Sequence, residues 1–419
     1  MIAVLSMLVA AYAVPVARGA GTNAEWTVMV YLDGDNNLDP DSLADISEMM
    51  EVGSTAKVNV LVLWDRFSEP AYLYQVLPGE LKLMDGLKVN GLAVNGQEIS
   101  MADWHVLEAF VDYGKVNLPA NHYMLDLWDH GNAFGSACWD DHADAPWNAS
   151  TSKAVSLDQM TKALAGSGTM DILTYDGCTI GMVEIAHNLT LIPASMGEQI
   201  QYLVASEEYV PNSGYTYDHI LTEMNSMSDL SAAAVAKMLA DEYAQAYSPH
   251  GDAKGGSTVN LSVMDISKIA PIAPALKTLT SLLKQGLSED FDYYHGLISE
   301  VRGEANLGWS LYGWDYRVDL GTFLSALSVL SNDQAVKTLA DSILGMIQDA
   351  VYVANTPAME SQGATGLGVW FPGSSRSLGN ANTGGVGTLT RYSQVFAFSE
   401  DAGWGSFLGA YWGKAPKPK

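Results

Sequence analysis

A histidine and a cysteine each follow a short apolar run that ends in a turn. "YMLDLWDHGN" at 123–132 contains His130, and "DILTYDGC" at 171–178 ends in Cys178. A cysteine attacks a carbonyl as its thiolate, and a nearby imidazole can take up the thiol proton and later protonate a leaving group. These residues therefore predict cysteine-dependent acyl transfer, with Cys178 as nucleophile and His130 as base and acid.

The same two segments can supply an oxyanion hole. Gly131 allows a substrate carbonyl to approach closely because it has no side chain. The backbone N–H groups of Gly131 and of Cys178 can then stabilise the oxyanion. A helix expected to begin near Thr179 would point its positive end at Cys178 and lower the pKa of the thiol.

Structural roles for these residues remain open. A cysteine at the end of a buried strand can be a small apolar core residue, and a histidine there can be structural. A zinc site formed by His130, Cys138, His142 and Cys178 is a third interpretation, but the spacing matches no recognised ligand pair and there is no CxxC. We therefore predict no metal ligands, and two free thiols instead of a disulfide.

Apolar patterning predicts the elements that position these residues. The runs 25–32 and 57–65 are rich in β-branched residues, as is typical of parallel strands buried on both faces, and the helical spacing at 39–53 lies between them. Further strands are predicted over 121–129, 170–177 and 201–208, and further helices over 101–116, 156–168 and 181–190.

This alternation predicts an α/β fold with an open, mostly parallel sheet covered by helices on both faces, and an antiparallel excursion at 72–84. Ligands bind such sheets outside the carboxyl ends of the strands, and consecutive strands are usually neighbours. His130 and Cys178 should therefore meet above the sheet.

The pattern divides the chain into four parts. Residues 1–23 resemble a signal peptide, with a retained N-terminal anchor as the alternative, so we expect a secreted or cell-surface protein. The catalytic α/β domain is predicted over 24–225. A mainly helical C-terminal subdomain over 226–375 has helices expected at 229–247, 270–287 and 320–331 and a final strand at 366–372. A Gly-rich loop and tail occupy 376–419.

The charge restricts the partners of this chain. It has 48 acidic and 21 basic residues among 419, a formal net charge of -27. Nucleic acids and anionic membrane surfaces attract basic patches, so neither is expected as a partner beyond a possible N-terminal anchor. A cationic substrate would be attracted.

Six segments resemble, in order and approximate spacing, the clostripain family of cysteine peptidases. They are "YLDGDNNLD", "WDHGNAFG", "TYDGCTIGMVEIA", "YLVASEEYVPNSGYTYDHIL", "VDLGTFL" and "GLGVWFP". The resemblance runs from about residue 25 to about residue 375. It implies a caspase-like fold, shared with gingipains and legumains, and an endopeptidase acting on protein or peptide substrates. A binding or cell-surface protein that keeps the fold without activity is the alternative.

The resemblance also assigns roles. It implies a dyad of His130 and Cys178, with Asp176 at the base of the S1 pocket selecting Arg or Lys. A carboxylate beside the nucleophile would indeed favour a cation, although a helix-capping role for Asp176 is equally open. Glu207, or its neighbour Glu208, would add a second acidic wall.

Two regulatory properties occur in the family. Members often cut themselves between the histidine and the cysteine. The segment 138–160 contains one Lys or Arg, Lys153, and we expect the cut after this residue. Asp33, Asp35 and Asn37 follow an alternating pattern of calcium ligands, but Leu38 stands where an EF-hand needs glycine. We expect no required cofactor, and leave calcium open.

Overall fold

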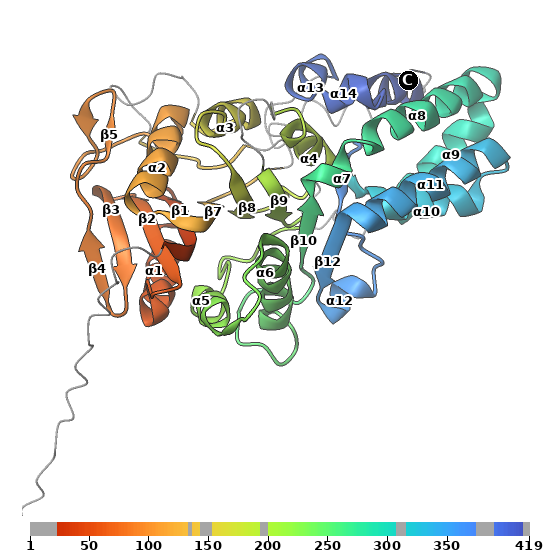
Figure 1. Cartoon of the computed structure of the whole chain (residues 1–419). Helices are drawn as coiled ribbons and strands as arrows, with labels where there is room; N and C mark the ends of the chain where they lie inside the picture. The colour runs from red at the N-terminus through yellow and green to blue at the C-terminus, as the bar shows by residue number, and fades with distance from the viewer. Residues whose placement is uncertain are drawn as a thin grey trace, which may run out of the picture.

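The computed structural model describes residues 23–132, 136–142, 153–192, 200–306, 316–373 and 389–413. A nine-stranded sheet runs through the molecule in the order β12-β10-β9-β8-β7-β1-β2-β3-β4 (Figure 1). Its parallel centre consists of β9 (Ile200–Ala205), β8 (Met170–Asp176), β7 (Ala120–Trp128), β1 (Ala24–Gly34) and β2 (Val58–Arg66). The predicted α/β class with a mostly parallel sheet is confirmed.

Antiparallel strands flank this centre on both sides. The predicted excursion at 72–84 is the hairpin of β3 (Glu69–Leu77) and β4 (Glu80–Leu83), which pairs with β2. On the other side, β10 (Asn260–Asp265) and β12 (Val351–Asn355) extend the sheet beyond β9. Neither strand was expected from the sequence, because each is a short run that carries little period-2 signal of its own.

Helices cover both faces of the sheet and enclose two hydrophobic clusters (Figure 1). One face is covered by α1 (Asp39–Val52), α5 (Tyr217–Ser226) and α6 (Ala232–Ala246). The other is covered by α2 (Trp104–Asn117), α3 (Leu157–Leu164) and α4 (Val183–Leu189). The parallel strands are buried on both sides, which explains their continuous apolar sequences.

Local sequence signals favour the start of the helices next to the site. Helix α1 starts with Asp39 and carries Pro40 in its first turn, where proline is tolerated and acidic residues suit the helix dipole. Helix α3 starts at a capping box in which Ser156 and Gln159 bond each other's backbone N–H groups.

The C-terminal half adds a helical body beside the β12 edge. It contains α7 (Ile266–Ile269), α8 (Ile272–Glu289), α9 (Phe291–Glu304), α10 (Leu320–Leu330), α11 (Gln334–Ala350) and α12 (Pro357–Glu360). A small sheet pairs β11 (Arg317–Asp319) with β13 (Gly368–Trp370), and a two-residue hairpin, β5 (Lys88–Val89) with β6 (Leu92–Ala93), lies near α2.

The last described stretch is helical. It consists of α13 (Leu389–Val395), α14 (Phe398–Asp401) and α15 (Trp404–Trp412), which bury Tyr392, Trp404 and Phe407 against α8 and β13. These helices were not anticipated within the predicted loop and tail.

The proposed boundary at 225/226 falls in the last turn of α5 and stays a prediction. Residues 226–375 also supply β10 and β12 to the main sheet. Almost all of the proposed signal peptide, the Gly-rich loop at 379–388 and the terminal residues 414–419 lie outside the described residues. Within the described part, no helix is both long enough and apolar enough to cross a membrane.

Candidate active site

The register of two central strands brings the predicted dyad together. Strands β7 and β8 pair in parallel, with Trp128 opposite Asp176, and the N–H of Asp129 donates to the Asp176 carbonyl at 3.3 Å. His130 and Cys178 each follow this last pair by two residues. Both side chains border the same small cavity of about 60 Å³ at the carboxyl end of the sheet. This is the meeting that the strand pattern predicted.

Two glycines allow the loops after these strands to pack backbone to backbone. A Cβ added to Gly131 would lie 2.5 Å from the carbonyl oxygen and 3.0 Å from the nitrogen of Cys178. A Cβ added to Gly177 would lie 2.7 Å from the carbonyl oxygen of Asp129. Because real side chains do not tolerate such distances, glycine is required at both positions for this approach.

Cys178 is largely buried as a thiol. Its Sγ donates to the carbonyl oxygen of Val210 at 3.6 Å. Burial raises the pKa of the Cys178 thiol to about 11, although the Val210 contact and the Arg317 charge act in the opposite direction. Desolvation therefore dominates, and the resting thiol keeps its proton at neutral pH.

The helix after the nucleophile starts later than predicted. Helix α4 begins at Val183 and has seven residues, and Thr179 instead adopts a φ of 60°. The N–H groups of Thr179 and Gly181 bond the carbonyls of Glu208 and Ser206, so this segment is an extended connection. The expected dipole of a helix starting at Thr179 is thus wrong, because backbone pairing with 206–208 competes with helix formation.

His130 has a partner that the sequence analysis missed. Its Nε2 lies 3.0 Å from Oδ1 of Asn37, which follows β1. Burial lowers the pKa of the His130 imidazole, while Asp141 opposes this shift, so the ring is neutral at neutral pH. Asn37 had been considered only within the calcium pattern, and no local signal links it to a residue 93 positions away.

A buried aspartate holds the loops around His130. The Nδ2 of Asn36 donates to Oδ1 of Asp129 at 2.8 Å and to the carbonyl of Trp139 at 2.9 Å. The backbone N–H of Trp139 donates to Oδ2 of Asp129. This network connects the loop after β1, the His130 turn and the segment 136–142. It thereby fixes the backbone on both sides of His130.

Asp176 lies at the inner wall of the cavity. Its carboxylate is buried, with an exposed fraction of 5%, and its Oδ2 accepts a hydrogen bond from the N–H of Tyr215 at 2.8 Å. Burial raises the pKa of the Asp176 carboxyl, and the neighbouring Asp126 adds to this effect. Asp176 does not cap α4, whose N-cap residue is Met182.

Glu207 lies elsewhere. Its side chain is fully buried, and Oε1 accepts from Nδ2 of Asn260 at 2.8 Å and from the N–H of Gly366 at 3.1 Å. It does not line the cavity. The neighbouring Glu208 forms an ion pair with Nη2 of Arg317 at 3.1 Å. The structure therefore brings Asp176, but not Glu207, to the predicted pocket.

Lys153 lies on the surface with 62% of its side chain exposed, and its Nζ lies 3.6 Å from Oδ1 of Asp141. Its carbonyl accepts from the N–H of Asp140 at 3.0 Å, and Val155, two residues later, pairs with Ala137. Ala137 forms a further β-bridge with Gly131. It thus connects the segment around Lys153 to Gly131.

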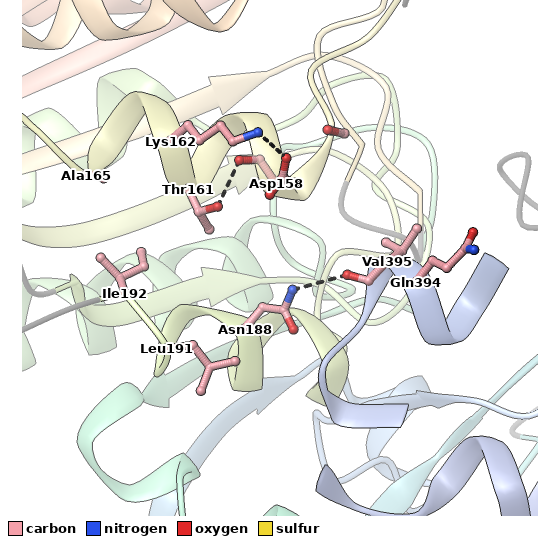
Figure 2. A pocket seen from close by; sticks show the side chains of 10 residues that line it. Asp158, Thr161, Lys162, Ala165, Asn188, Leu191, Ile192, Gln394 and Val395 are labelled. Atoms are coloured by element: carbon pink, nitrogen blue, oxygen red, sulfur yellow. Dashed lines mark hydrogen bonds and ion pairs between the residues drawn. The ribbon is translucent and has the colours of Figure 1, made fainter. Parts of the chain in front are cut away.

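Other possible sites are less suited to acyl transfer. Both cysteines are free, as predicted, and among the described residues His130, Cys138, His142 and Cys178 do not form a zinc-like cluster. A larger cavity of about 550 Å³ lies between α3, the end of α4 and α13 (Figure 2). It borders Asp158, Lys162 and Asn188, whose polar groups already bond one another or the backbone of Val395, and it contains neither His130 nor Cys178.

Known proteins resemble this chain in sequence and in fold. The chain is 24% identical over 409 residues to clostripain of Hathewaya histolytica, covering 84% of this chain and 75% of that protein. Among solved structures it resembles a secreted C11 cysteine protease from Bacteroides thetaiotaomicron in complex with an irreversible peptide inhibitor, with a TM-score of 0.63, 17% identity and 91% and 99% of the two chains covered. An inactive zymogen C11 protease from Parabacteroides distasonis gives a TM-score of 0.61 at 18% identity, with the same coverage.

These likenesses establish the caspase-like arrangement of the sheet and helices. The model of the clostripain family matches residues 30–404, which include both strand ends and the helices α13 and α14. The match decides between the peptidase and the non-catalytic binding protein that the sequence left as alternatives. The chain belongs to the clostripain family and is a cysteine peptidase.

Proposed function

We propose that this peptidase is an endopeptidase that cleaves protein or peptide substrates after Arg or Lys, with Cys178 and His130 as its catalytic dyad. The observation that carries the proposal is the buried carboxylate of Asp176 in the wall of the cavity that both residues border. A buried carboxylate next to the nucleophile favours a cationic side chain and disfavours an acidic one. The net charge of -27 would attract such substrates.

The protonation states support a stepwise mechanism. At neutral pH the thiol and the imidazole are both neutral, because burial raises the pKa of Cys178 and lowers that of His130. With Nε2 bonded to Asn37, Nδ1 of His130 is the nitrogen that accepts the thiol proton as Sγ attacks the carbonyl carbon. The imidazolium then protonates the amine as the C–N bond breaks. Water releases the acyl group with His130 as base, restoring the thiol.

The oxyanion is assigned to the backbone N–H groups of Gly131 and Cys178. Support comes from the contact between the two backbones, which a Cβ on Gly131 would prevent. Backbone donors held in this way need no reorganisation when charge develops on the carbonyl oxygen.

Matched fluorogenic peptides that end in Arg, Lys, Asp or Ala test this proposal. We expect hydrolysis after Arg or Lys only, lost in Cys178→Ala and reduced in Asp176→Asn. Cys138→Ala is the matched control, because it removes the other thiol, which is buried and does not line the cavity. Equal rates on Arg and Ala peptides would contradict the role of Asp176, and activity in Cys178→Ala would contradict that of Cys178.

We also propose self-cleavage after Lys153. The exposed side chain supports this, although the Lys153 carbonyl would have to leave the N–H of Asp140 before attack. Mass spectrometry should find two fragments from the wild type and an intact chain from both Cys178→Ala and Lys153→Ala. Lys162→Ala, which changes an exposed lysine on α3, should be cut like the wild type. An equally cut Cys178→Ala protein would point to another protease.

For localisation we propose secretion or display at the cell surface. The apolar run within residues 1–23 supports export. A structural relative is described as a secreted protease. Fractionation of the native host's culture, followed by N-terminal sequencing of the mature chain, tests this and shows whether the first segment is removed.

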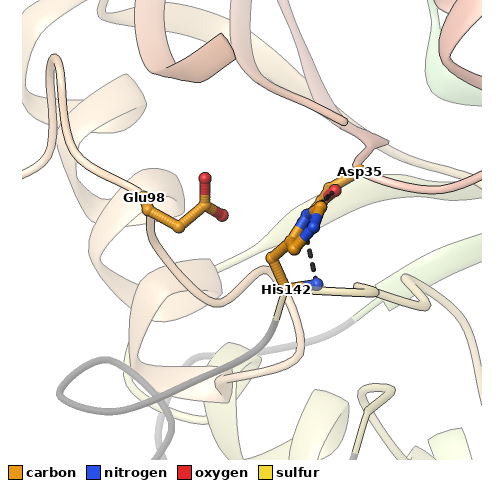
Figure 3. Close-up of side chains that lie close together, drawn as sticks. All are labelled: Asp35, Glu98 and His142. Atoms are coloured by element: carbon orange, nitrogen blue, oxygen red, sulfur yellow. Dashed lines mark hydrogen bonds and ion pairs between the residues drawn. The ribbon is translucent and has the colours of Figure 1, made fainter. Parts of the chain in front are cut away.

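We propose further that a cation, with calcium as the first choice, binds an acidic cluster near the active-site end of β1. Asp35, Glu98 and His142 place one ligand atom each within 4.8 Å of one another (Figure 3). His142 also bonds Asp35, with Nδ1 2.6 Å from Oδ1.

Buried carboxylates surround this group. One oxygen each of Asp33, Asp65 and Asp140 is buried without a hydrogen-bond partner among the described residues. Burial, and after it repulsion from neighbouring carboxylates, raises the pKa of all three carboxyls. Calcium prefers several carboxylate oxygens, so this donor set fits it, and the ion would lower the repulsion between them. No step of the proposed mechanism passes through it.

A further inference from the structure

A second buried carboxylate lies directly beneath Asp176. Asp126 is on β7, and its Oδ1 accepts the backbone N–H of Asp176 at 3.1 Å. The hydroxyl of Tyr217, at the start of α5, donates to Oδ2 of Asp126 at 2.6 Å and lies 3.3 Å from Oδ2 of Asp176. One phenol therefore bridges two carboxylates, and both carboxylates are at least 95% buried, with exposed fractions of 2% and 5%.

The groups that face this pair come from every neighbouring element. They are Asp45 and Glu48 of α1, Trp128 of β7, Cys138 and His130 of the adjoining loops, Cys178, Tyr215 and Tyr217, and Tyr243 and Tyr247 of α6. Nearly all of them are acids, phenols or thiols. Arg317 acts on Cys178 and is paired with Glu208.

These surroundings determine how many protons the pair holds. Two carboxylates this close, in a site shielded from water, do not both ionise readily. Burial is the largest cause that raises the pKa of each, and the repulsion from Asp126 adds to the rise at Asp176. The Tyr217 phenol keeps its own proton, because burial and the same two carboxylates raise its pKa. The empty pocket therefore retains one proton on the pair.

We propose that Asp126 is a second specificity-determining residue, which shares one proton with Asp176 across the Tyr217 hydroxyl and releases it to solvent when a guanidinium or ammonium group enters the pocket. The entering charge takes the place of the proton as counter-charge to the pair. A neutral side chain offers no such replacement, so its entry leaves the proton in place. Asp126 thus adds discrimination by charge without touching the substrate itself. This inference rests on the proposed Arg/Lys specificity.

Linkage gives the sign of the expected pH dependence. A cation lowers the pKa of the pair when it binds, so binding at low pH must expel a proton and is weakened. Affinity for a cation should increase by up to tenfold per pH unit from about pH 5 until the free pair loses its proton, and then level off. Binding should release close to one proton in the acidic part of this range.

Agmatine, an alkyl guanidinium that has no bond to cleave, is the probe. Calorimetric titration of the full wild-type chain, in two buffers of different ionisation enthalpy, counts the protons released. In Asp126→Asn the amide can bond Tyr217 and the N–H of Asp176 while it removes one acid. The repulsion from Asp126 is then absent while the burial of Asp176 remains, so Asp176 ionises at a lower pH than in the wild type. The proton release and the pH dependence of affinity should both move to lower pH.

Two further variants isolate the effect. Tyr217→Phe removes the shared donor, so the pair should hold its proton to higher pH and the affinity curve should move upward in pH. Asp171→Asn is the matched control, because Asp171 is buried on β8 at the opposite end of the strand and bonds His122 and Tyr123. It should leave both measurements unchanged.

The outcomes separate this inference from the proposed function. If agmatine binds and Arg peptides are cleaved, but no proton is released and Asp126→Asn keeps the wild-type pH profile, the shared proton is overturned and the Arg/Lys pocket stands. If folded wild type neither binds agmatine nor cleaves after Arg or Lys, the proposed specificity fails and this inference with it. Circular dichroism of each variant establishes that it is folded.

Discussion

Nε2 of His130 lies 3.0 Å from Oδ1 of Asn37, so the imidazole at the end of β7 is oriented by an amide from the loop after β1. The two loops are held in place by Asn36 and Asp129, whose side chains bond at 2.8 Å. An amide oxygen accepts a hydrogen bond from the ring without adding charge. Asn37 therefore selects the tautomer that carries its proton on Nε2 and leaves Nδ1 to exchange the thiol proton.

Removal of this acceptor should slow catalysis. We expect Asn37→Ala to lower kcat on an Arg peptide by roughly tenfold, with little change in KM, since the loss affects proton transfer and not substrate binding. Asn37→Asp keeps the acceptor and should recover much of kcat, while its charge raises the pKa of His130 and displaces the pH profile upward. An unchanged pH profile in Asn37→Asp would contradict a contact between residue 37 and the imidazole.

The approach of Gly131 to Cys178 predicts a severe effect of a single methyl group. In Gly131→Ala the added Cβ would meet the Cys178 carbonyl at 2.5 Å, so the two backbones must separate. We expect kcat/KM to fall by about 100-fold through loss of the oxyanion donors, and the free energy of unfolding to fall by about 1–3 kcal/mol. Kinetics and urea unfolding measure the two effects.

Gly345→Ala is its control. Gly345 lies within α11, and an added Cβ meets nothing within 4 Å. Alanine there should leave activity unchanged and stabilise the helix by about 0.5–1 kcal/mol. Wild-type kinetics in Gly131→Ala would show that the backbone N–H of Gly131 does not contact the reacting carbonyl.

The buried thiol predicts slow alkylation of the free enzyme. Because burial raises the pKa of Cys178 to about 11, thiolate is scarce at neutral pH and increases as the pH rises. The rate of inactivation by iodoacetamide should therefore increase by up to about tenfold per pH unit through neutral and alkaline pH. Cys178→Ala provides the background from Cys138. A plateau already reached near neutral pH would show that the resting enzyme contains a thiolate.

A buried glutamate predicts a loss of stability as the pH rises from acidic to neutral. Oε1 of Glu184 accepts from the N–H of Trp370 at 2.9 Å and from the hydroxyl of Tyr392 at 2.8 Å. Burial raises the pKa of Glu184 to about 7. Its folded pKa is thus above the unfolded value, so the unfolded state ionises first and this group's contribution to stability is lost as the pH rises from about 4 to about 7.

Glu184→Gln should remove that contribution. The Tm of Glu184→Gln minus the Tm of wild type should be larger at pH 8 than at pH 5. The corresponding change in the free energy of unfolding should be about 3 kcal/mol at most. Scanning calorimetry at both pH values measures it. Glu300→Gln, which changes an exposed glutamate of α9, should follow the wild type at both. A parallel pH dependence in Glu184→Gln and wild type would mean that Glu184 ionises alike in both states.

The acidic cluster predicts stabilisation by calcium. Addition of about 1 mM calcium should raise the Tm of Cys178→Ala, a background without self-cleavage, and Asp140→Asn should largely abolish the increase. Asp158→Asn, at an exposed position of α3, is the control. No shift with any divalent ion would reject the cation site. A larger shift with zinc or manganese would mean that the site prefers an ion other than calcium, as an imidazole ligand such as His142 would favour.

Sequence alone determined the parallel centre of the fold and the two strand ends that carry chemistry. The runs at 25–32, 57–65 and 170–177 are continuously apolar because both faces of those strands are buried, and that signal is local. From this signal we predicted that His130 and Cys178 lie at one edge of a sheet. Lone strands such as β10 and β12 left no comparable signal.

Tertiary structure decided what the site residues touch. Asn37 bonds His130 over 93 positions, and Tyr217 joins Asp126 to Asp176 over 91 and 41 positions, so no local pattern records either contact. Glu207 was expected to form a second wall of the pocket. Its carboxylate is instead buried and bonded to Asn260 and Gly366. Spacing along a chain fixes which face a residue occupies, whereas packing between distant elements fixes its partners, its burial and therefore its protonation.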